Sequence, residues 1–162
     1  MIQRIQTVLF MVATACFSVA CFVPIGTMTT HDTYYVVTSW ALKENIPNGA
    51  VVYPTYFIGL SQIILAVISF IAIFLYKNRP AQSKFCIAAI VINFVLILLM
   101  LYVYPEIAFS KLWQVAGAEL LYYRSGHFPW ALLSIFPLAC FYFANKFIIR
   151  DEKKVRAADR LR

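Results

Sequence analysis

Charged residues are scarce in this chain of 162 residues, because Asp, Glu, Lys and Arg together make up only 13% of it. An average soluble domain has about 25% charged residues. Hydrophobic residues reach 62% and aromatic residues 17%. A soluble fold of this size leaves about 30% of its chain's surface in water, so its interior is too small to bury so many apolar side chains. Disordered chains are poor in these residue types. The composition therefore excludes both classes and predicts an integral membrane protein.

Motifs of known chemistry are also lacking. There is no P-loop, no GxSxG, no HExxH and no pair of carboxylates with catalytic spacing. His31 and His127 are two imidazoles without a carboxylate pair beside them, which makes a poor metal site. The four cysteines form no CxxC pair and lie in apolar segments, so redox catalysis and structural disulfides have no support. We expect no catalytic residue, cofactor or metal, and an intramembrane enzyme ranks last among the alternatives.

Four apolar segments are long enough to cross a hydrocarbon core, which takes about 20 residues. They are residues 5–23, 56–76, 85–104 and 128–149. None contains Asp, Glu or Arg, and the stem of Lys146 can snorkel from the end of the fourth segment. In lipid the backbone N–H and C=O groups must hydrogen-bond to one another, and apolar runs of this length do so as helices. We therefore predict an all-α membrane protein, with an antiparallel four-helix transmembrane domain at residues 1–149 and a basic cytoplasmic tail at 150–162.

Proline residues mark the predicted helix ends. Pro24, Pro105 and Pro129 stand where the helices should stop or start. Pro137 lies midway along the fourth segment, where a missing N–H group should bend the helix. The short connection at residues 77–84 makes the second and third helices an antiparallel pair.

Lys and Arg residues fall unevenly on the two sides of these spans. Eleven of the 14 belong to the N-terminus, the connection 77–84 and the segment from residue 146 onward. The other two loops hold Lys43, Lys111 and Arg124, together with four acidic residues. Because cytoplasmic loops carry the excess of Lys and Arg, we expect a multi-pass protein of the bacterial inner membrane with both termini in the cytoplasm. This topology accounts for the net charge of +7 without nucleic acid as a partner.

The first apolar segment has a second interpretation, as a cleaved signal peptide. Arg4 precedes it, and the residues before Cys21 hint at a lipoprotein cleavage site. However, Ser18 stands where a larger aliphatic residue is usual, and the apolar run continues past Cys21. We favour an uncleaved first helix and keep cleavage as the minor alternative.

The two outer connections carry weaker patterns. In the first, β-rich stretches at residues 33–38 and 50–53 flank a strong turn signal at 47–49, which predicts a small hairpin over the outer helix ends. In the second, helical spacing predicts a short helix with one apolar face. That face consists of Phe109, Leu112, Trp113 and Ala116. We expect this helix to pack as a lid, with a position flat at the outer interface as the alternative.

Two amides, Gln62 and Asn93, stand inside the apolar spans. We predict that they hydrogen-bond across the second and third helices, a contact worth roughly 0.6 kcal/mol. The alternative is a permeation or ligand site, although the spans hold no ionisable group at mid-membrane, as ion-coupled transporters generally do. Thr14 and Ser18 have the small-xxx-small spacing that lets membrane helices approach closely.

The tail at residues 150–162 carries six cations among three acidic residues. The cations are Arg150, Lys153, Lys154, Arg156, Arg160 and Arg162. They are candidates to bind anionic membrane lipids at about 1 kcal/mol each, or to dock a membrane or cytoplasmic protein, which the interspersed acidic residues favour. Our leading hypothesis is a non-catalytic accessory, assembly or scaffold subunit. The alternative is a small oligomeric transporter or channel with Gln62 and Asn93 along its path.

Three short stretches carry a family resemblance. They are MIQRIQT at residues 1–7, FLYKNR at 74–79 with FC at 85–86, and RDEKKVRAADRLR at 150–162. These stretches resemble a family of small membrane proteins from Bacteroidota, catalogued as domain of unknown function 4293. The resemblance covers the whole chain and is most specific in the tail. It implies a four-helix inner-membrane protein and no particular catalytic residue.

Overall fold

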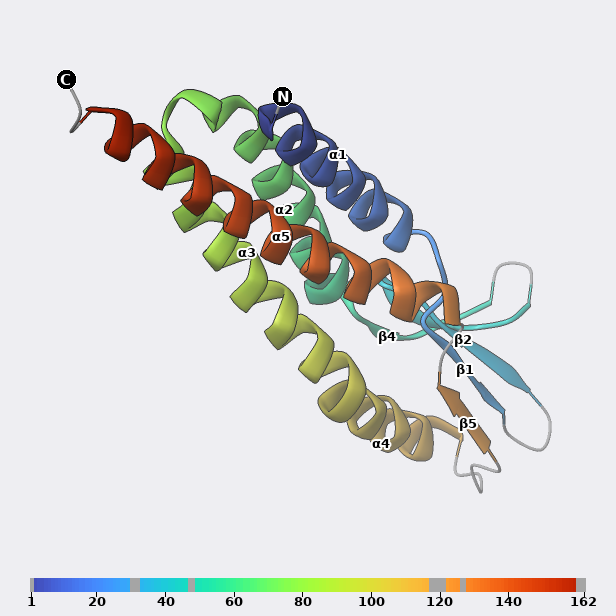
Figure 1. Ribbon diagram of the computed structural model, residues 1–162. Coiled ribbons are helices and arrows are strands. Elements are labelled where there is room, and N and C mark those ends of the chain that lie inside the picture. Colours follow the sequence, from blue (N-terminus) through green and yellow to red (C-terminus); the bar gives the residue numbers. More distant parts are fainter. Residues whose placement is uncertain (1, 30–32, 47–48, 117–121, 126–127, 160–162) are drawn as a thin grey trace.

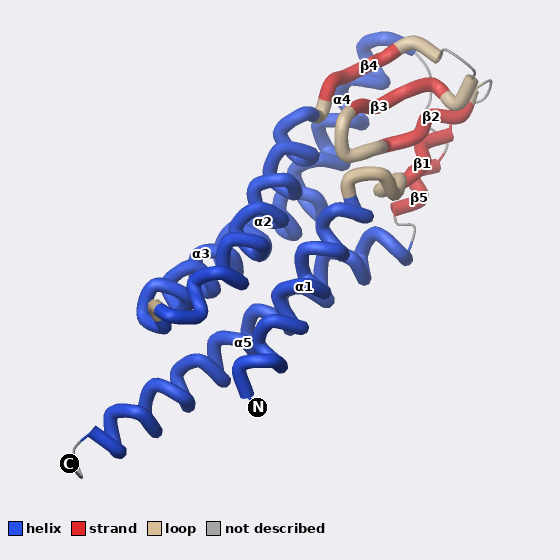
Figure 2. Tube along the Cα trace, turned by 90° about the horizontal axis from the view of Figure 1, so that it is seen from above, coloured by secondary structure: helices blue, strands red, loops and turns tan. Residues whose placement is uncertain are grey.

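A computed structural model of the protein describes residues 2–29, 33–46, 49–116, 122–125 and 128–159. The molecule has two parts, a long helical bundle and a small β-sheet at one end of it (Figures 1 and 2). The bundle helices are α1 (Ile2–Ala20), α2 (Tyr56–Phe74), α3 (Arg79–Leu98) and α5 (Phe128–Asp159). Two short turns, η1 (Leu75–Lys77) and η2 (Leu99–Val103), and the helix α4 (Tyr104–Ala116) connect them.

The four bundle helices are arranged as a ring. α1 packs against α2 and α5, and α3 packs against the same two helices. α2, the segment Arg79–Gln114 and the α5 segment Leu132–Val155 are long and apolar enough to cross a membrane, whereas the apolar part of α1, Ile5–Ala20, is shorter. The prediction of apolar spanning helices is therefore confirmed for three helices, with α1 as a fourth, shorter apolar helix.

Aromatic side chains of the first and last helices meet in the bundle core. The ring centroid of Phe141 on α5 lies 6.3 Å from that of Phe10 and 6.1 Å from that of Phe17. All three side chains are buried. The hydroxyl of Ser69 on α2 donates a hydrogen bond to the backbone carbonyl of Phe10 at 2.9 Å. The centre of the bundle is thus both apolar and tied across helices.

The third span differs from its prediction at both ends. α3 begins at Arg79 rather than Phe85, because the Asn78 side chain caps it by accepting from the Ala81 N–H, and Pro80 suits the first turn. At the other end the helical backbone passes Pro105 and runs on to Ala116, so the predicted stop there is wrong. The turn η2 is a π-helix, and a wide turn of this kind accommodates a following proline that has no N–H group to donate.

The predicted short outer helix exists as α4, but its inward face is different. Tyr104, Ala108 and Leu112, spaced four residues apart, are buried. Phe109 and Trp113 are half exposed and stack on one another, with ring centroids 6.3 Å apart. α4 contacts strand β4 (Val51–Pro54), so the helix does pack against the sheet.

The sheet is larger than the predicted hairpin. It is antiparallel and has five strands in the order β4-β3-β2-β1-β5. The other four strands are β1 (Gly26–Thr29), β2 (Tyr34–Val37), β3 (Ala41–Glu44) and β5 (Tyr122–Ser125). The predicted pairing of residues 33–38 with 50–53 is wrong, because β3 lies between them and pairs with both: Val36 faces Lys43, and Leu42 faces Tyr53.

The turn between β2 and β3 inserts between the end of α1 and the start of α2. The Ser39 hydroxyl donates to the carbonyl of Ala20 at 3.2 Å, and the Trp40 indole N–H donates to the carbonyl of Cys21 at 3.0 Å. In return, the Gly59 N–H donates to the carbonyl of Ser39 at 2.9 Å. The turn thus hydrogen-bonds to backbone carbonyl and N–H groups that have no partner within their own helix. These bonds explain how the sheet is fixed to the bundle.

Candidate functional site

Most of the cations lie at the end of the bundle opposite the sheet, whereas Lys43, Lys111 and Arg124 lie at the sheet end. The N-terminus, the α2–α3 connection and the end of α5 share one end, which we call the basic end, and the sheet occupies the other (Figure 1). Arg79, Lys84, Lys146 and Arg150 belong to the basic end. The uneven distribution of charge along the sequence is therefore also a distribution in space.

The predicted tail begins as a continuation of α5, which runs for 32 residues to Asp159. Arg150, Lys153 and Lys154 are exposed on it. The backbone of Arg156 lies in the same helix, and Arg160 and Arg162 lie outside the described residues. The described cations of the tail are thus carried on helical backbone.

One acidic residue of this segment is turned inward and was missed by the sequence reasoning. Asp151 is buried, and its Oδ2 accepts a hydrogen bond from Nε2 of Gln6, also buried, at 3.1 Å. Asp151 continues the buried stripe Phe141, Ala144 and Ile148 on α5 at spacings of three and four. That periodicity in the sequence was the available signal. The contact fixes the end of α5 to the first turns of α1.

The guanidinium of Arg150 lies 5.6 Å from the ring centroid of Phe147 on the same helix. A cation at this distance over an aromatic face is attracted by the ring. The first cation of the tail is thereby held close to the surface of α5.

The two intramembrane amides do not bond to one another as predicted. Asn93 donates from Nδ2 to the backbone carbonyl of Ser134 on α5 at 3.0 Å, while its Oδ1 has no partner in the described part of the chain. Gln62 is buried with neither side-chain atom bonded to any described residue. The carbonyl that Asn93 binds lies three residues before Pro137, in the turn where the proline has no N–H to donate. Asn93 therefore joins α3 to α5 at that turn.

Reactive groups are sparse in the described residues. Cys16, Cys21, Cys86 and Cys140 are all free thiols. Among the described residues no group of three or more His, Cys, Asp or Glu side chains could hold a metal ion. His31 and His127 lie outside the described residues.

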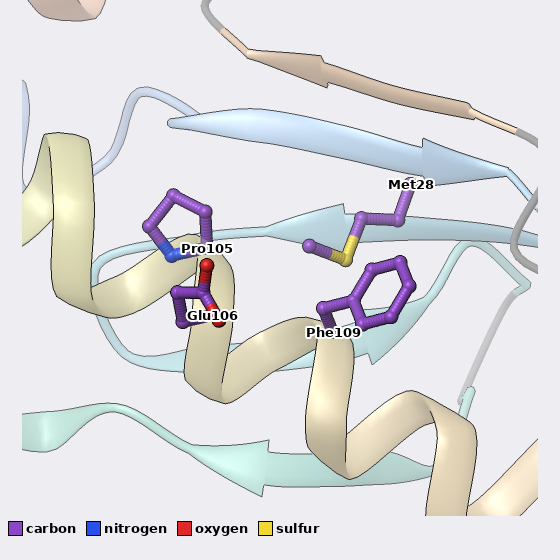
Figure 3. Close-up of a pocket in the computed structure, with 4 residues that line it drawn as sticks. All are labelled: Met28, Pro105, Glu106 and Phe109. Carbon is purple, nitrogen blue, oxygen red and sulfur yellow. The ribbon is translucent and has the colours of Figure 1, made fainter.

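A pocket of about 280 Å³ lies between strand β1 and α4. Figure 3 shows Met28 reaching from β1 toward Phe109 of α4, with Pro105 and Glu106 one turn away. The exposed carboxylate of Glu106 is the one charged group among these four residues. The part of the pocket wall that the described residues form is mostly apolar and carries one negative charge, that of Glu106.

A groove of about 280 Å³ runs between α1 and α2 on the bundle surface. Thr14, Ser18, Cys21 and Ala66 are among the residues that line it. The Thr14 hydroxyl donates to the carbonyl of Phe10 and the Ser18 hydroxyl to that of Thr14, each at 2.9 Å. The other lining residues, Ile63, Val67 and Phe70, are large and apolar. Because both hydroxyls bond within α1, the groove presents a mostly apolar surface, with its small side chains on the α1 side. Small residues of this kind let another helix approach closely.

A comparison with protein-family models gives a match over nearly the whole chain. A family model described as a domain of unknown function, DUF4293, matches residues 2–161. This match confirms the family resemblance that the terminal and connecting stretches carry. No curated protein matches the chain.

Proposed function

We propose that this chain, which belongs to the DUF4293 family, is an integral protein of the bacterial inner membrane with both termini in the cytoplasm. The apolar helices support the membrane location. The gathering of Lys and Arg at the end that holds both termini supports the orientation, because cytoplasmic segments carry the excess of these residues.

Within that membrane, we propose a non-catalytic accessory, assembly or scaffold subunit that acts through its helices and the basic end of α5. The observation that carries this proposal is the buried bond from Gln6 to Asp151. It anchors α5 at the point where the exposed cations Arg150, Lys153 and Lys154 begin. A helix held in this way presents its charges in a fixed arrangement, which suits a specific protein partner better than a flexible tail does.

The groove between α1 and α2 supplies a second contact surface for the same role. Its apolar α2 wall and the small residues Thr14 and Ser18 of α1 suit packing by an apolar helix of a membrane partner. An accessory subunit of this design binds its partner both inside the membrane and beneath it, and it requires no reactive side chain.

Purification of the full chain in mild detergent tests this role. The tail variant Lys153→Gln/Lys154→Gln is compared with a matched control, Lys43→Gln/Lys111→Gln, which removes the same charge at the sheet end. We expect a stoichiometric protein partner, identified by mass, that stays with the natural chain and the control and is lost from the tail variant. A natural chain that runs alone, or a partner that the tail variant retains, contradicts the role.

The alternative function is a small oligomeric transporter or channel. The observation that favours it is the buried side chain of Gln62, which has no hydrogen-bond partner among the described residues and stands free to bind a passing polar solute. Gln62→Leu and Asn93→Leu should abolish transport in reconstituted vesicles if this function is right. A scaffold should keep its partner after both substitutions.

A further inference from the structure

A hydrogen bond joins α3 and α5 near the basic end. The Ser83 hydroxyl of α3 donates to Oδ1 of Asn145 on α5 at 2.6 Å, and both residues are half-buried. α3 runs from the basic end toward the sheet and α5 runs back, so the two helices are antiparallel (Figure 1). The pair Ser83–Asn145 therefore fixes how the two helices face each other at this level.

The residues that follow this pair are both lysines. Successive residues of an α-helix are about 100° apart, so in two antiparallel helices the residues after a facing pair turn to the same side. Lys84 and Lys146 are both exposed, which agrees with this geometry. The residues before the pair, Gln82 and Ala144, turn to the opposite side and are 3% and 0% exposed. Lys84 and Lys146 thus flank the line between α3 and α5 on the outer surface of the bundle.

A third cation extends this pair along α5. Arg150 lies one turn beyond Lys146 at i+4 spacing and is exposed on the same face. We call Lys84, Lys146 and Arg150 the basic seam. The nearby carboxylate of Asp151 points inward to Gln6. Within the described part of the chain, none of the three cations forms an ion pair with a carboxylate. Like charges held together in this way favour a bound anion.

Apolar side chains continue the seam toward the middle of the bundle. On α3, Ile87 and Val91 are 50% and 55% exposed, three and seven residues from Lys84. On α5, Tyr142 and Phe143 are 58% and 48% exposed, within one turn of Lys146. One strip of surface therefore carries cations at the basic end and apolar side chains further in.

We infer that the basic seam is a binding site for an anionic phospholipid. Its phosphate contacts Lys84, Lys146 and Arg150, and its acyl chains lie along Ile87, Val91 and Tyr142. Basic pockets between transmembrane helices on the cytoplasmic side bind such headgroups by charge. The inference rests on the proposed membrane insertion, and it goes beyond the proposed function because Lys84 and Lys146 lie outside the 150–162 tail.

Native mass spectrometry of the full chain, taken from nanodiscs of mixed phosphatidylglycerol and phosphatidylcholine, tests the site. We expect phosphatidylglycerol to stay bound to the natural chain. Lys84→Gln/Lys146→Gln removes two cations and should lower its retention by about 30-fold. The control Lys43→Gln/Lys111→Gln removes the same charge at the sheet end and should retain the lipid. Lys84→Arg/Lys146→Arg, which keeps both charges, should retain it as well.

Three results would overturn the inference. The first is equal retention by the natural chain and Lys84→Gln/Lys146→Gln. The second is an equal loss from the control, which would indicate a general effect of net charge. The third is displacement of the lipid by soluble glycerol phosphate at equal concentration, which would make the ligand a free anion. Failure of the chain to enter nanodiscs contradicts the proposed membrane location instead. Incorporation into nanodiscs is therefore measured first, before the amount of bound lipid.

Discussion

The indole ring of Trp40 lies directly over Gly59 at the start of α2. A Cβ atom at residue 59 would stand 2.8 Å from the Cε3 and Cζ3 atoms of that ring. The same tryptophan donates from its indole N–H to the carbonyl of Cys21 and accepts at its own carbonyl from the Thr55 N–H at 2.8 Å. One side chain therefore holds the sheet against two helix ends, and it fits there because residue 59 has no side chain.

Gly59→Ala should destabilise the protein by about 1–3 kcal/mol, because the added methyl group overpacks the contact with Trp40. Helix propensity alone would favour alanine by about 1 kcal/mol, so the sign of the change separates the two effects. The measurement is thermal unfolding in detergent. Trp40→Leu should be destabilising alone and should make Gly59→Ala harmless. If Gly59→Ala unfolds at a higher temperature than the natural chain, the close contact is refuted.

Asp151→Ala should destabilise the protein by about 1–3 kcal/mol, since it leaves the buried Gln6 amide without its acceptor. Asp151→Asn keeps an acceptor oxygen and should lose less. The measurement is the rate at which a protease removes the end of α5, together with the unfolding midpoint. Lys153→Ala, an exposed neighbour, is the control and should change neither. A rate for Asp151→Ala equal to that of the control would mean that the bond does not anchor the helix.

Gln62 and Asn93 should respond oppositely to apolar replacement. Gln62→Met removes a buried amide that has no partner among the described residues and should raise the unfolding midpoint. Asn93→Leu removes the donor to Ser134 and should lower the midpoint. The free energy of unfolding should fall by about 0.6 kcal/mol, the value of a single hydrogen bond between membrane helices. Equal losses in both variants would show that Gln62 has acquired a partner, such as a bound solute, and would favour the transport alternative.

The proposed orientation in the membrane predicts which surface lysines a reagent can reach. After alanine replaces the four native cysteines, Lys43→Cys should react with a membrane-impermeant maleimide in intact spheroplasts. Lys153→Cys, equally exposed but at the basic end, should react only after lysis. Labelling of Lys153→Cys in intact spheroplasts would reverse the proposed orientation.

The helices were predictable because they depend on long apolar runs, which composition reveals directly. The sheet was predictable only in part. The predicted stretches 33–38 and 50–53 coincide with β2 and β4, but β3 has the sequence Ala-Leu-Lys-Glu, which favours helix on its own and is held extended only by its two neighbours. The helix end predicted at Pro105 is wrong for a related reason. The π-helical turn before Pro105 accommodates a residue without an N–H group, so the helix continues through it.

The candidate site was predicted only in part. The exposed cations Arg150, Lys153 and Lys154 follow from composition, since charged side chains seldom lie buried. The inward turn of Asp151 and the pairing of Lys84 with Lys146 depend on which residues of different helices face each other. The sequence of one helix does not indicate directly which residues of another helix will face it.

The bond between Gln6 and Asp151 joins residues that are 145 positions apart. During synthesis α1 is made well before Asp151, which supplies the acceptor for this bond. Until then Phe10 and Phe17 have only α2 to pack against, because Phe141 has not been made. α1 is thus only partly enclosed until α5 has been made, and throughout that interval its inner face is open to contact with other apolar helices.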